Sequence, residues 1–334
     1  MFKFRFAGQA SVVAATWIVL GVPAFAQADP LPSWNDGAAK TAIVAFVDKV
    51  TDHASADFVQ PQDRIATFDN DGTLWTEQPV YTQLLFAFDR IRAMAKDHPE
   101  WATQEPYKSV IAGDMKGLEA LGEKGLVQII ATTHAGMTTD EFHQIVADWI
   151  ATAKSPKFDR PYTQLVYQPM LELMDYLRDK DFKTFIVSGG GVEFMRPWSE
   201  ATYGIPPEQV VGSSGKVTFE LDAQGKARLV KQADVEFVDD GAGKPVGINR
   251  FIGHRPILAV GNSDGDLQML QYVASGDGPH FVAFVHHDDD TREVAYDRTS
   301  AIGKLDKGLD AAAAGDWLVV SMKDDWKSVF PPAP

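Results

Sequence analysis

The chain has 334 residues and contains no cysteine, so neither a disulfide nor a lipid-modified cysteine can form. Long apolar runs are also missing. The longest run, from about Ala10 to Val22, is shorter than the roughly 20 residues that span a bilayer, and no comparable run follows it. Stability must therefore come from a packed core, and the 45% apolar content is enough to build one or two domains.

Basic residues are the third shortage, because 31 Lys and Arg residues stand against 46 Asp and Glu residues, giving a formal net charge of −15. A surface of this sign repels nucleic acid and anionic lipid, so we expect neither as a partner. The simpler explanation of the acidity is that it keeps an exported protein soluble.

Residues 1–28 have the composition of a signal peptide. Lys3 and Arg5 precede the apolar run, and a Pro-Ala-Phe-Ala segment ending at Ala26 offers a small-x-small cleavage pattern. We expect cleavage after Ala26 or Ala28, and a protein that is periplasmic or secreted and free of the membrane. Removing the two basic residues lowers the formal net charge by two, from −15 to −17.

Strand and helix patterns alternate over most of the remaining chain, which is typical of an α/β fold. The sequence predicts a Rossmann-like, mostly parallel sheet with helices on both faces. A β-hairpin is expected within 216–238, with its turn at Gly225. The expected strands are 65–68, 183–188, 210–211, 257–260, 280–285 and an edge strand at 317–322, and the expected helices include 36–51, 168–181, 192–203 and 246–252.

Residues 79–159 interrupt this alternation after the first strand. From residue 80 to about residue 154, apolar side chains recur at spacings of three and four, which predicts a helical insert. One of its helices should begin with a capping box formed by Thr138 and Glu141. The α/β core is therefore expected to comprise 29–78 and 160–334.

Two carboxylates, Asp69 and Asp71, follow the first strand directly, within Phe68-Asp-Asn-Asp-Gly-Thr-Leu. Like charges this close call for a cation, and Mg²⁺ is the natural candidate. Asp, Asn and Gly are also the commonest turn formers, so these letters alone are equally typical of a simple turn.

Polar residues also lie next to the second and third predicted strands. Ser188 ends the second strand before three glycines, Lys244 precedes the third strand, and Gly-Asn-Ser-Asp-Gly-Asp at 261–266 follows it. The carboxyl ends of parallel strands meet at one edge of a sheet, where ligands bind. Carboxylates, a hydroxyl beside free N–H groups and an ammonium are together the groups that handle a phosphoryl group.

Each of these motifs has a plainer interpretation. Ser188 and its glycines could form an ordinary turn, and Lys244 could be a solvated loop lysine, in which case Lys231 is the fallback.

In order and spacing, the four motifs resemble those of haloacid-dehalogenase-type phosphohydrolases, over roughly Arg64 to Leu270. Within that family the layout is similar to phosphoserine-phosphatase-type members with a helical cap. The resemblance implies that residues 79–159 are the cap. It also implies a nucleophile at Asp69 that forms an aspartyl-phosphate, a general acid and base at Asp71, and phosphate binding by Ser188 and Lys244.

The resemblance further implies a Mg²⁺ cofactor and a small soluble phosphate ester as substrate, phosphoserine-like or non-specific. The expected metal ligands are Asp69, Asp71, Asn262 and Asp266, and the expected substrate contacts are Thr73, Gly189 and Glu77. Glu77 should border the pocket mouth with Trp75 and Tyr81, where it could bind a cationic group. The oligomeric state is left open.

Asn262 departs from the family pattern, which commonly has a metal-binding Asp at this position. An amide oxygen can ligate but brings no charge, so we expect weaker Mg²⁺ binding or a shift of the ligand to Asp264. Two alternatives follow. The protein could bind phosphorylated ligands without turnover, or it could be another hydrolase of the family, such as a dehalogenase, although Asp71 would then have no leaving alcohol to protonate.

Three histidines are weaker candidates. His286 and His287 precede three aspartates and could bind a metal, but a solvated loop tip before a capping box of Asp290 and Glu293 is favoured. His134 lies in the insert and could touch substrate, although a structural loop is the favoured interpretation.

Overall fold

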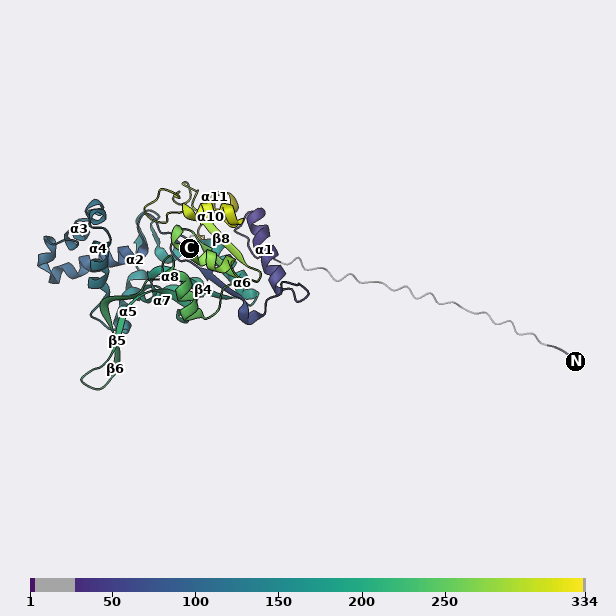
Figure 1. Cartoon of the computed structure of the whole chain (residues 1–334), viewed down its shortest axis with the longest axis horizontal. Coiled ribbons are helices and arrows are strands. Elements are labelled where there is room, and N and C mark those ends of the chain that lie inside the picture. Colours follow the sequence, from purple (N-terminus) through teal and green to yellow (C-terminus); the bar gives the residue numbers. More distant parts are fainter. Residues whose placement is uncertain (4–27, 333–334) are drawn as a thin grey trace.

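The computed structural model of the chain describes residues 1–3 and 28–332, so residues 4–27 of the predicted signal peptide lie outside it. A seven-stranded sheet runs through the molecule in the order β6-β5-β4-β1-β7-β8-β9 (Figure 1). Only β5 and β6 pair antiparallel, which confirms the mostly parallel sheet. The strands are β1 (Ile65–Phe68), β4 (Lys183–Gly191), β5 (Val210–Leu221), β6 (Ala227–Phe237), β7 (Leu258–Gly261), β8 (Phe281–His286) and β9 (Leu318–Ser321).

Helices cover both faces of the sheet, as predicted. Successive residues of a strand point to opposite faces, so Ile186 and Val187 belong to two different hydrophobic clusters. The cluster of Ile186 includes α1 (Ala38–Thr51), α6 (Gln168–Asp179) and α7 (Val192–Tyr203). The cluster of Val187 includes α9 (Leu267–Ala274) and α10 (Lys307–Gly315). The short helices α8 (Gly243–Gly247) and α11 (Met322–Asp325) complete the core.

The insert between β1 and β4 is helical and has a small core of its own. Figure 1 shows α2, α3 and α4 at one end of the molecule. The predicted capping box of Thr138 and Glu141 begins α5. The helices are α2 (Thr82–Met94), α3 (Tyr107–Ala112), α4 (Met115–His134) and α5 (Thr139–Ile150), followed by the two-stranded pair of β2 (Lys154–Ser155) and β3 (Arg160–Pro161). The insert core contains Ala87, Phe88, Ile91, Trp101, Tyr107, Val110, Leu118 and Ile129.

The hairpin differs from its prediction in one respect. Residues 210–211 and the first arm of the hairpin are one continuous strand, β5, which pairs with β4 at its start and with β6 beyond it. The turn contains Gly225 with φ 78°, as predicted. The hairpin also contacts the insert, because the Lys231 N–H donates to the Met137 carbonyl and the Gly136 N–H donates to the Lys231 carbonyl, both at 2.9 Å.

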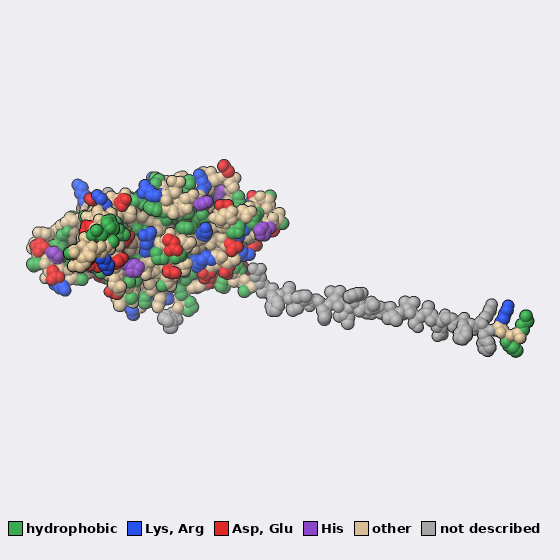
Figure 2. Space-filling model, turned by 90° about the horizontal axis from the view of Figure 1, so that it is seen from below, with side chains coloured by type: hydrophobic (Ala, Val, Ile, Leu, Met, Phe, Trp, Pro, Cys, Tyr) green, Lys and Arg blue, Asp and Glu red, His purple; other side chains and the backbone are tan. Residues whose placement is uncertain are grey.

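The surface seen in Figure 2 carries acidic and basic side chains interspersed over one face, with no large field of a single sign. Among the described residues, none of the helices combines the length and the apolarity needed to cross a bilayer.

Candidate active site

Three neighbouring strands end at the edge of the sheet where the chemistry was predicted. In the order β4-β1-β7, Asp69 follows β1, Ser188 belongs to the last part of β4, and Asn262 follows β7. Because the three strands are parallel, their carboxyl ends meet. A cavity of about 620 Å³ opens there, and its lining includes Asp69, Asp71, Ser188, Lys244 and Asp266.

The chain turns sharply after Asp71 because Gly72 has a φ of 76°, a conformation that side-chain-bearing residues rarely adopt. A residue with a side chain would also lack room at position 72. A Cβ atom on Gly72 would lie 2.1 Å from Asn262 Nδ2 and 2.4 Å from Glu77 Oε1. Glycine therefore serves both the turn and the close approach of Asn262 and Glu77.

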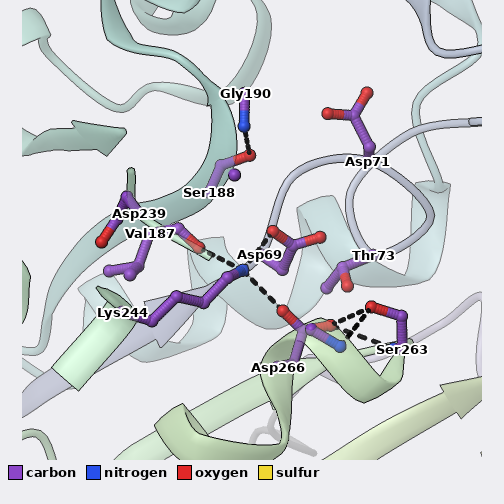
Figure 3. A network of polar contacts seen from close by, with 12 residues as sticks. Asp69, Asp71, Thr73, Val187, Ser188, Gly190, Asp239, Lys244, Ser263 and Asp266 are labelled. Carbon is purple, nitrogen blue, oxygen red and sulfur yellow. Dashed lines mark hydrogen bonds and ion pairs between the residues drawn. The ribbon is translucent and has the colours of Figure 1, made fainter. Parts of the chain in front are cut away.

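Lys244 supplies a buried cation and is only 1% exposed. Its Nζ donates to Asp69 Oδ1 at 2.6 Å, to Asp266 Oδ1 at 2.5 Å and to the Val187 carbonyl at 2.9 Å (Figure 3). Burial alone would lower the pKa of Lys244, but the charges of Asp266 and Asp69 outweigh it and raise the pKa above its ordinary value. Lys244 is thus a charged group in the first turn of α8, and the alternative of a solvated loop lysine is wrong.

Two carboxylates share this single ammonium, which leaves one negative charge uncompensated in the buried site. Burial, together with the charge of Asp266, raises the pKa of Asp69 well above its usual range. A divalent cation beside Asp69 would remove this penalty by neutralising the excess charge.

Asp266 holds Lys244 and also shapes the turn after β7. Its Oδ2 accepts hydrogen bonds from the backbone N–H of Asn262 at 2.9 Å and from the backbone N–H of Ser263 at 3.0 Å. Both carboxylate oxygens are therefore engaged by the protein, and metal binding by Asp266 stays a prediction. Asp264 lies in the same turn, but its Oδ1 accepts from the backbone N–H groups of residues 306 and 308 at 2.9 and 2.8 Å.

Asn262 belongs to a second network of buried side chains, with Thr73 and Glu77. Its Nδ2 donates to Glu77 Oε1 at 2.7 Å, and its Oδ1 accepts from Thr73 Oγ1 at 3.0 Å. Tyr296 also donates to Glu77 Oε1, at 2.7 Å. These contacts fix the amide of Asn262, so its oxygen and nitrogen have separate partners.

The predicted substrate contacts are placed differently from one another. Gly189 and Glu77 line the cavity, whereas Thr73 is fully buried and holds Asn262. Glu77 is only 2% exposed, so it lies behind the site and not at its mouth. Burial, with the charges of Asp71 and Asp69, raises the pKa of Glu77 well above its usual range. Tyr81, at 39% exposure, does border the opening.

Asp71 and Ser188 approach the glycine stretch from two sides. Trp75 Nε1 donates to Asp71 Oδ1 at 2.8 Å, and the Gly190 N–H donates to Ser188 Oγ at 3.1 Å. A Cβ atom on Gly190 would lie 3.4 Å from Ser188 Oγ and 3.5 Å from Asp71 Oδ2. Burial raises the pKa of Asp71, which favours the protonated form that a general acid needs.

The oxygen donors of this site fit Mg²⁺. No group of three or more His, Asp or Glu side chains among residues 1–3 and 28–332 is arranged to hold a metal ion. Mg²⁺ needs no such group, because it keeps several waters and is usually held by one or two carboxylates. The Asp69 carboxylate, the Asp71 backbone carbonyl and Asn262 Oδ1 would supply oxygen ligands, and the uncompensated charge at Asp69 favours a cation.

Sequence reasoning missed two residues of the site. Gln83 joins the insert to the glycines after Ser188, because its Oε1 accepts from the Gly191 N–H at 2.7 Å while its Nε2 lies 3.3 Å from His134 Nε2. Asp239 is fully buried near Lys244, and neither of its oxygens has a hydrogen-bond partner among the described residues (Figure 3). Burial raises the pKa of Asp239 to about 7. Neither residue belongs to a local sequence pattern.

The histidine predictions need one correction. His287 is 2% exposed, and its Nε2 donates to the Gly72 carbonyl at 2.7 Å, so it is a buried support of the Asp69–Gly72 turn and not part of a solvated loop tip. No helix begins at Asp290 in the structure, and Glu293 instead accepts from Thr76 Oγ1 at 2.7 Å.

The other two candidates outside the Asp69 cluster, His134 and Lys231, both line the cavity. Burial, with the charges of Lys231 and Arg90, lowers the pKa of His134 to about 3, so the ring is neutral. Lys231 pairs with Glu193 at 3.8 Å and not with Asp69, so the fallback for Lys244 is not needed.

The matched family model decides the classification. Residues 66–271, more than half of the chain, match the model of haloacid dehalogenase-like hydrolases. The chain belongs to this family. That range contains all four motifs, so the resemblance found in the sequence is confirmed at the level of the family.

Two solved structures are similar to this chain in fold. A conserved functionally unknown protein from Anaerococcus prevotii DSM 20548 is 15% identical, with a TM-score of 0.53, covering 89% of this chain and 96% of its own. A protein with unknown function from Bordetella pertussis Tohama I is 13% identical, with a TM-score of 0.50, covering 77% and 97%. At these identities the likeness concerns the fold alone. No curated protein sequence matches the chain.

Proposed function

We propose that this hydrolase cleaves phosphate monoesters through an aspartyl-phosphate on Asp69, with Mg²⁺ as cofactor. One observation carries the proposal: a buried ammonium, Lys244, lies 2.6 Å from Asp69 Oδ1 at the floor of a cavity that Ser188 and Asp71 also line. A dianionic phosphoryl group needs this combination of nucleophile, cation and hydroxyl.

In the first step Asp69 attacks phosphorus in line with the ester bond. Among the described residues no hydrogen bond is donated to Asp69 Oδ2, so this oxygen is free to attack while Lys244 holds Oδ1. A bond forms between Asp69 and phosphorus as the bond from phosphorus to the alcohol oxygen breaks. Asp71 gives its proton to the departing oxygen, Ser188 binds a non-bridging oxygen, and the positive charge of Lys244 stabilises the negative charge that accumulates on the phosphoryl group.

In the second step water attacks the same phosphorus. Asp71, now ionised, takes a proton from the water, and the bond between Asp69 and phosphorus breaks to release inorganic phosphate. A bound Mg²⁺ would supply charge neutralisation between the anionic nucleophile and the anionic phosphate. The chain would hold it with Asp69, the carbonyl of Asp71 and Asn262.

The place of action follows from residues 1–28. We assign the protein to the periplasm or the exterior of a bacterial cell, on a signal-peptide composition that precedes a core without cysteine. There it would act on small soluble esters, with no nucleic acid or membrane as partner.

The test is turnover of p-nitrophenyl phosphate by the protein lacking residues 1–28, with Mg²⁺ and with EDTA. Release of phosphate that EDTA abolishes supports the proposal. Release under neither condition favours the alternative of a phospho-ligand-binding protein with a weakened metal site at Asn262. Release of halide from a 2-haloacid, without phosphatase activity, would indicate a dehalogenase.

A further inference from the structure

The cavity has two chemically different parts. The carboxylates and Lys244 form its floor, whereas the walls that come from the insert and the hairpin combine apolar side chains with polar ones such as Gln83, Gln232 and Asp234. The apolar wall residues are Leu84 on α2, Leu126, Val127 and Ile130 on α4, and Val235 and Val238 on or beside β6.

Several of these wall residues are exposed although they are large and apolar. Leu126 is 38% exposed, Val127 48%, Val235 59% and Val238 58%. They come from α4 and from β6 or the residue after it, and all four line the same cavity, so they are not scattered singly over the surface. Apolar side chains that gather around a concave site are typical of a surface that an apolar ligand covers.

The polar groups in the upper cavity do not suit an anionic leaving group. Among the described lining residues the cations are Lys231 and Lys244. Lys244 is held by two carboxylates, and Lys231 pairs with Glu193 at 3.8 Å and lies 4.7 Å from the centre of the Phe142 ring. A carboxylate such as that of phosphoserine would thus lack a free cationic partner.

We propose that the ester has a neutral, apolar leaving group, alkyl or aryl, which lies between α4 and β6 while its phosphoryl group lies at Asp69. This inference rests on the proposed function and narrows its substrate class, in place of the phosphoserine-like esters that the resemblance implied. The volume supports it, because about 620 Å³ is more than a phosphoryl group fills and falls in the range of about 300–1,000 Å³ of sites for drug-sized ligands.

A series of straight-chain alkyl phosphates, from ethyl to octyl, tests the inference. All are esters of primary alcohols with nearly equal leaving-group pKa values, so differences in kcat/KM report binding of the chain. We expect kcat/KM to rise roughly two- to fourfold per methylene until the walls are filled. O-phosphoserine should be a poorer substrate than butyl phosphate. A flat series, or a preference for O-phosphoserine, would overturn the inference.

Matched variants locate the effect in the molecule. Leu126→Asn changes a wall residue, whereas Leu221→Asn changes a residue of the same type that is 61% exposed on the hairpin and does not line the cavity. The dependence on chain length should become flatter in Leu126→Asn and stay as in the parent in Leu221→Asn. Equal slopes in the two variants, with circular dichroism confirming that both are folded, would contradict the placement between α4 and β6.

Binding measurements separate this inference from the proposed function. Affinities of the corresponding alkylphosphonates, which cannot be hydrolysed at the ester position, are measured by calorimetry on the same proteins. If affinity rises with chain length but no ester is turned over, the apolar site is supported and the phosphatase proposal is overturned. If the esters are turned over but the affinities do not depend on chain length, the phosphatase proposal is supported and the apolar site is overturned.

Discussion

The side-chain amide of Asn262 donates from Nδ2 to Glu77 Oε1 at 2.7 Å, between two residues that are each less than 3% exposed. An aspartate at position 262 has no N–H to donate, so the contact would survive only if one of the two carboxyl groups kept a proton. The asparagine and Glu77 therefore depend on each other. The hydrogen bond to Glu77 is therefore a local physical reason for asparagine at position 262, where the family commonly has an aspartate.

Asn262→Asp tests this relationship. Without metal, the variant should be less stable than the parent by about 1–3 kcal/mol, because a hydrogen bond is replaced by repulsion between the new carboxylate and Glu77. Mg²⁺ should stabilise the variant more than the parent, since the added charge strengthens cation binding. Thermal unfolding with and without Mg²⁺ measures both effects. Asp264→Asn is the control, and an equal Mg²⁺-induced shift in Tm for Asn262→Asp and the parent would contradict the account.

Lys244→Met should destabilise the protein and abolish turnover. Removing the ammonium leaves Asp69 and Asp266 buried without their partner, which typically lowers the free energy of unfolding by about 3–5 kcal/mol. The loss should be smaller at pH 5 than at pH 8, because protonating a carboxylate relieves the unpaired charge. Urea unfolding at both values measures it.

Lys231→Met is the matched control for Lys244→Met. Its partner Glu193 is 3.8 Å away, and the Glu193 side chain is 24% exposed, so the loss should be near 1 kcal/mol. If Lys231→Met lost as much stability as Lys244→Met, the result would count against the buried charge cluster. A loss of stability in Lys244→Met that does not depend on pH would count against it as well.

Gly72→Ala should cost more than backbone strain alone. Gly113 has a similar φ of 69° but no atom within 4 Å of a Cβ, so Gly113→Ala measures the strain, about 1 kcal/mol. At Gly72 the added Cβ would also meet Asn262 and Glu77. Chemical denaturation should show at least twice the loss at Gly72, together with lost activity. Equal losses would mean that Asn262 and Glu77 move aside freely.

Asp239→Asn should remove a pH dependence of stability. The pKa of Asp239 is raised to about 7 in the folded protein, so the folded state keeps a proton that the unfolded state loses above about pH 4. The folded state binds more protons between these values, so stability falls as pH rises from about 4 to about 7 and stays lower above that.

Asparagine at position 239 cannot ionise, so the variant should gain up to about 4 kcal/mol in the free energy of unfolding at pH 8 relative to pH 4. Urea unfolding across this range measures the gain. Asp277→Asn, at an exposed position, should change nothing. An Asp239→Asn profile parallel to that of the parent would show that the pKa of Asp239 is the same in the folded and unfolded states.

The parts of the site that the sequence predicted are those that local patterns encode. Asp69 and Ser188 follow short apolar runs that are typical of buried strands, and the carboxyl ends of neighbouring parallel strands lie at the same edge of the sheet. The capping box of Thr138 and Glu141 is likewise a local pattern, and it was correct.

The parts that the sequence could not predict depend on contacts between distant segments. Asp290 and Glu293 have the spacing of a capping box, but the contact of Glu293 with Thr76, 217 residues away in sequence, took precedence. The burial of Asp239 arises only when distant core segments pack together, and the bond from Gly191 to Gln83, 108 residues apart, arises only when the insert packs on the core. Local patterns carry no signal for such contacts.

The most direct test of the account is the site of covalent phosphorylation. The protein without residues 1–28 is mixed with a phosphate ester and Mg²⁺, quenched in acid within one turnover, digested, and analysed by mass spectrometry. We expect one phosphoryl group on Asp69, which should form and disappear more slowly in Asp71→Asn because Asp71 acts in both steps, and none in Asp69→Asn, which should also be inactive. A phosphoryl group on another residue, or appreciable activity in Asp69→Asn, would contradict the central claim.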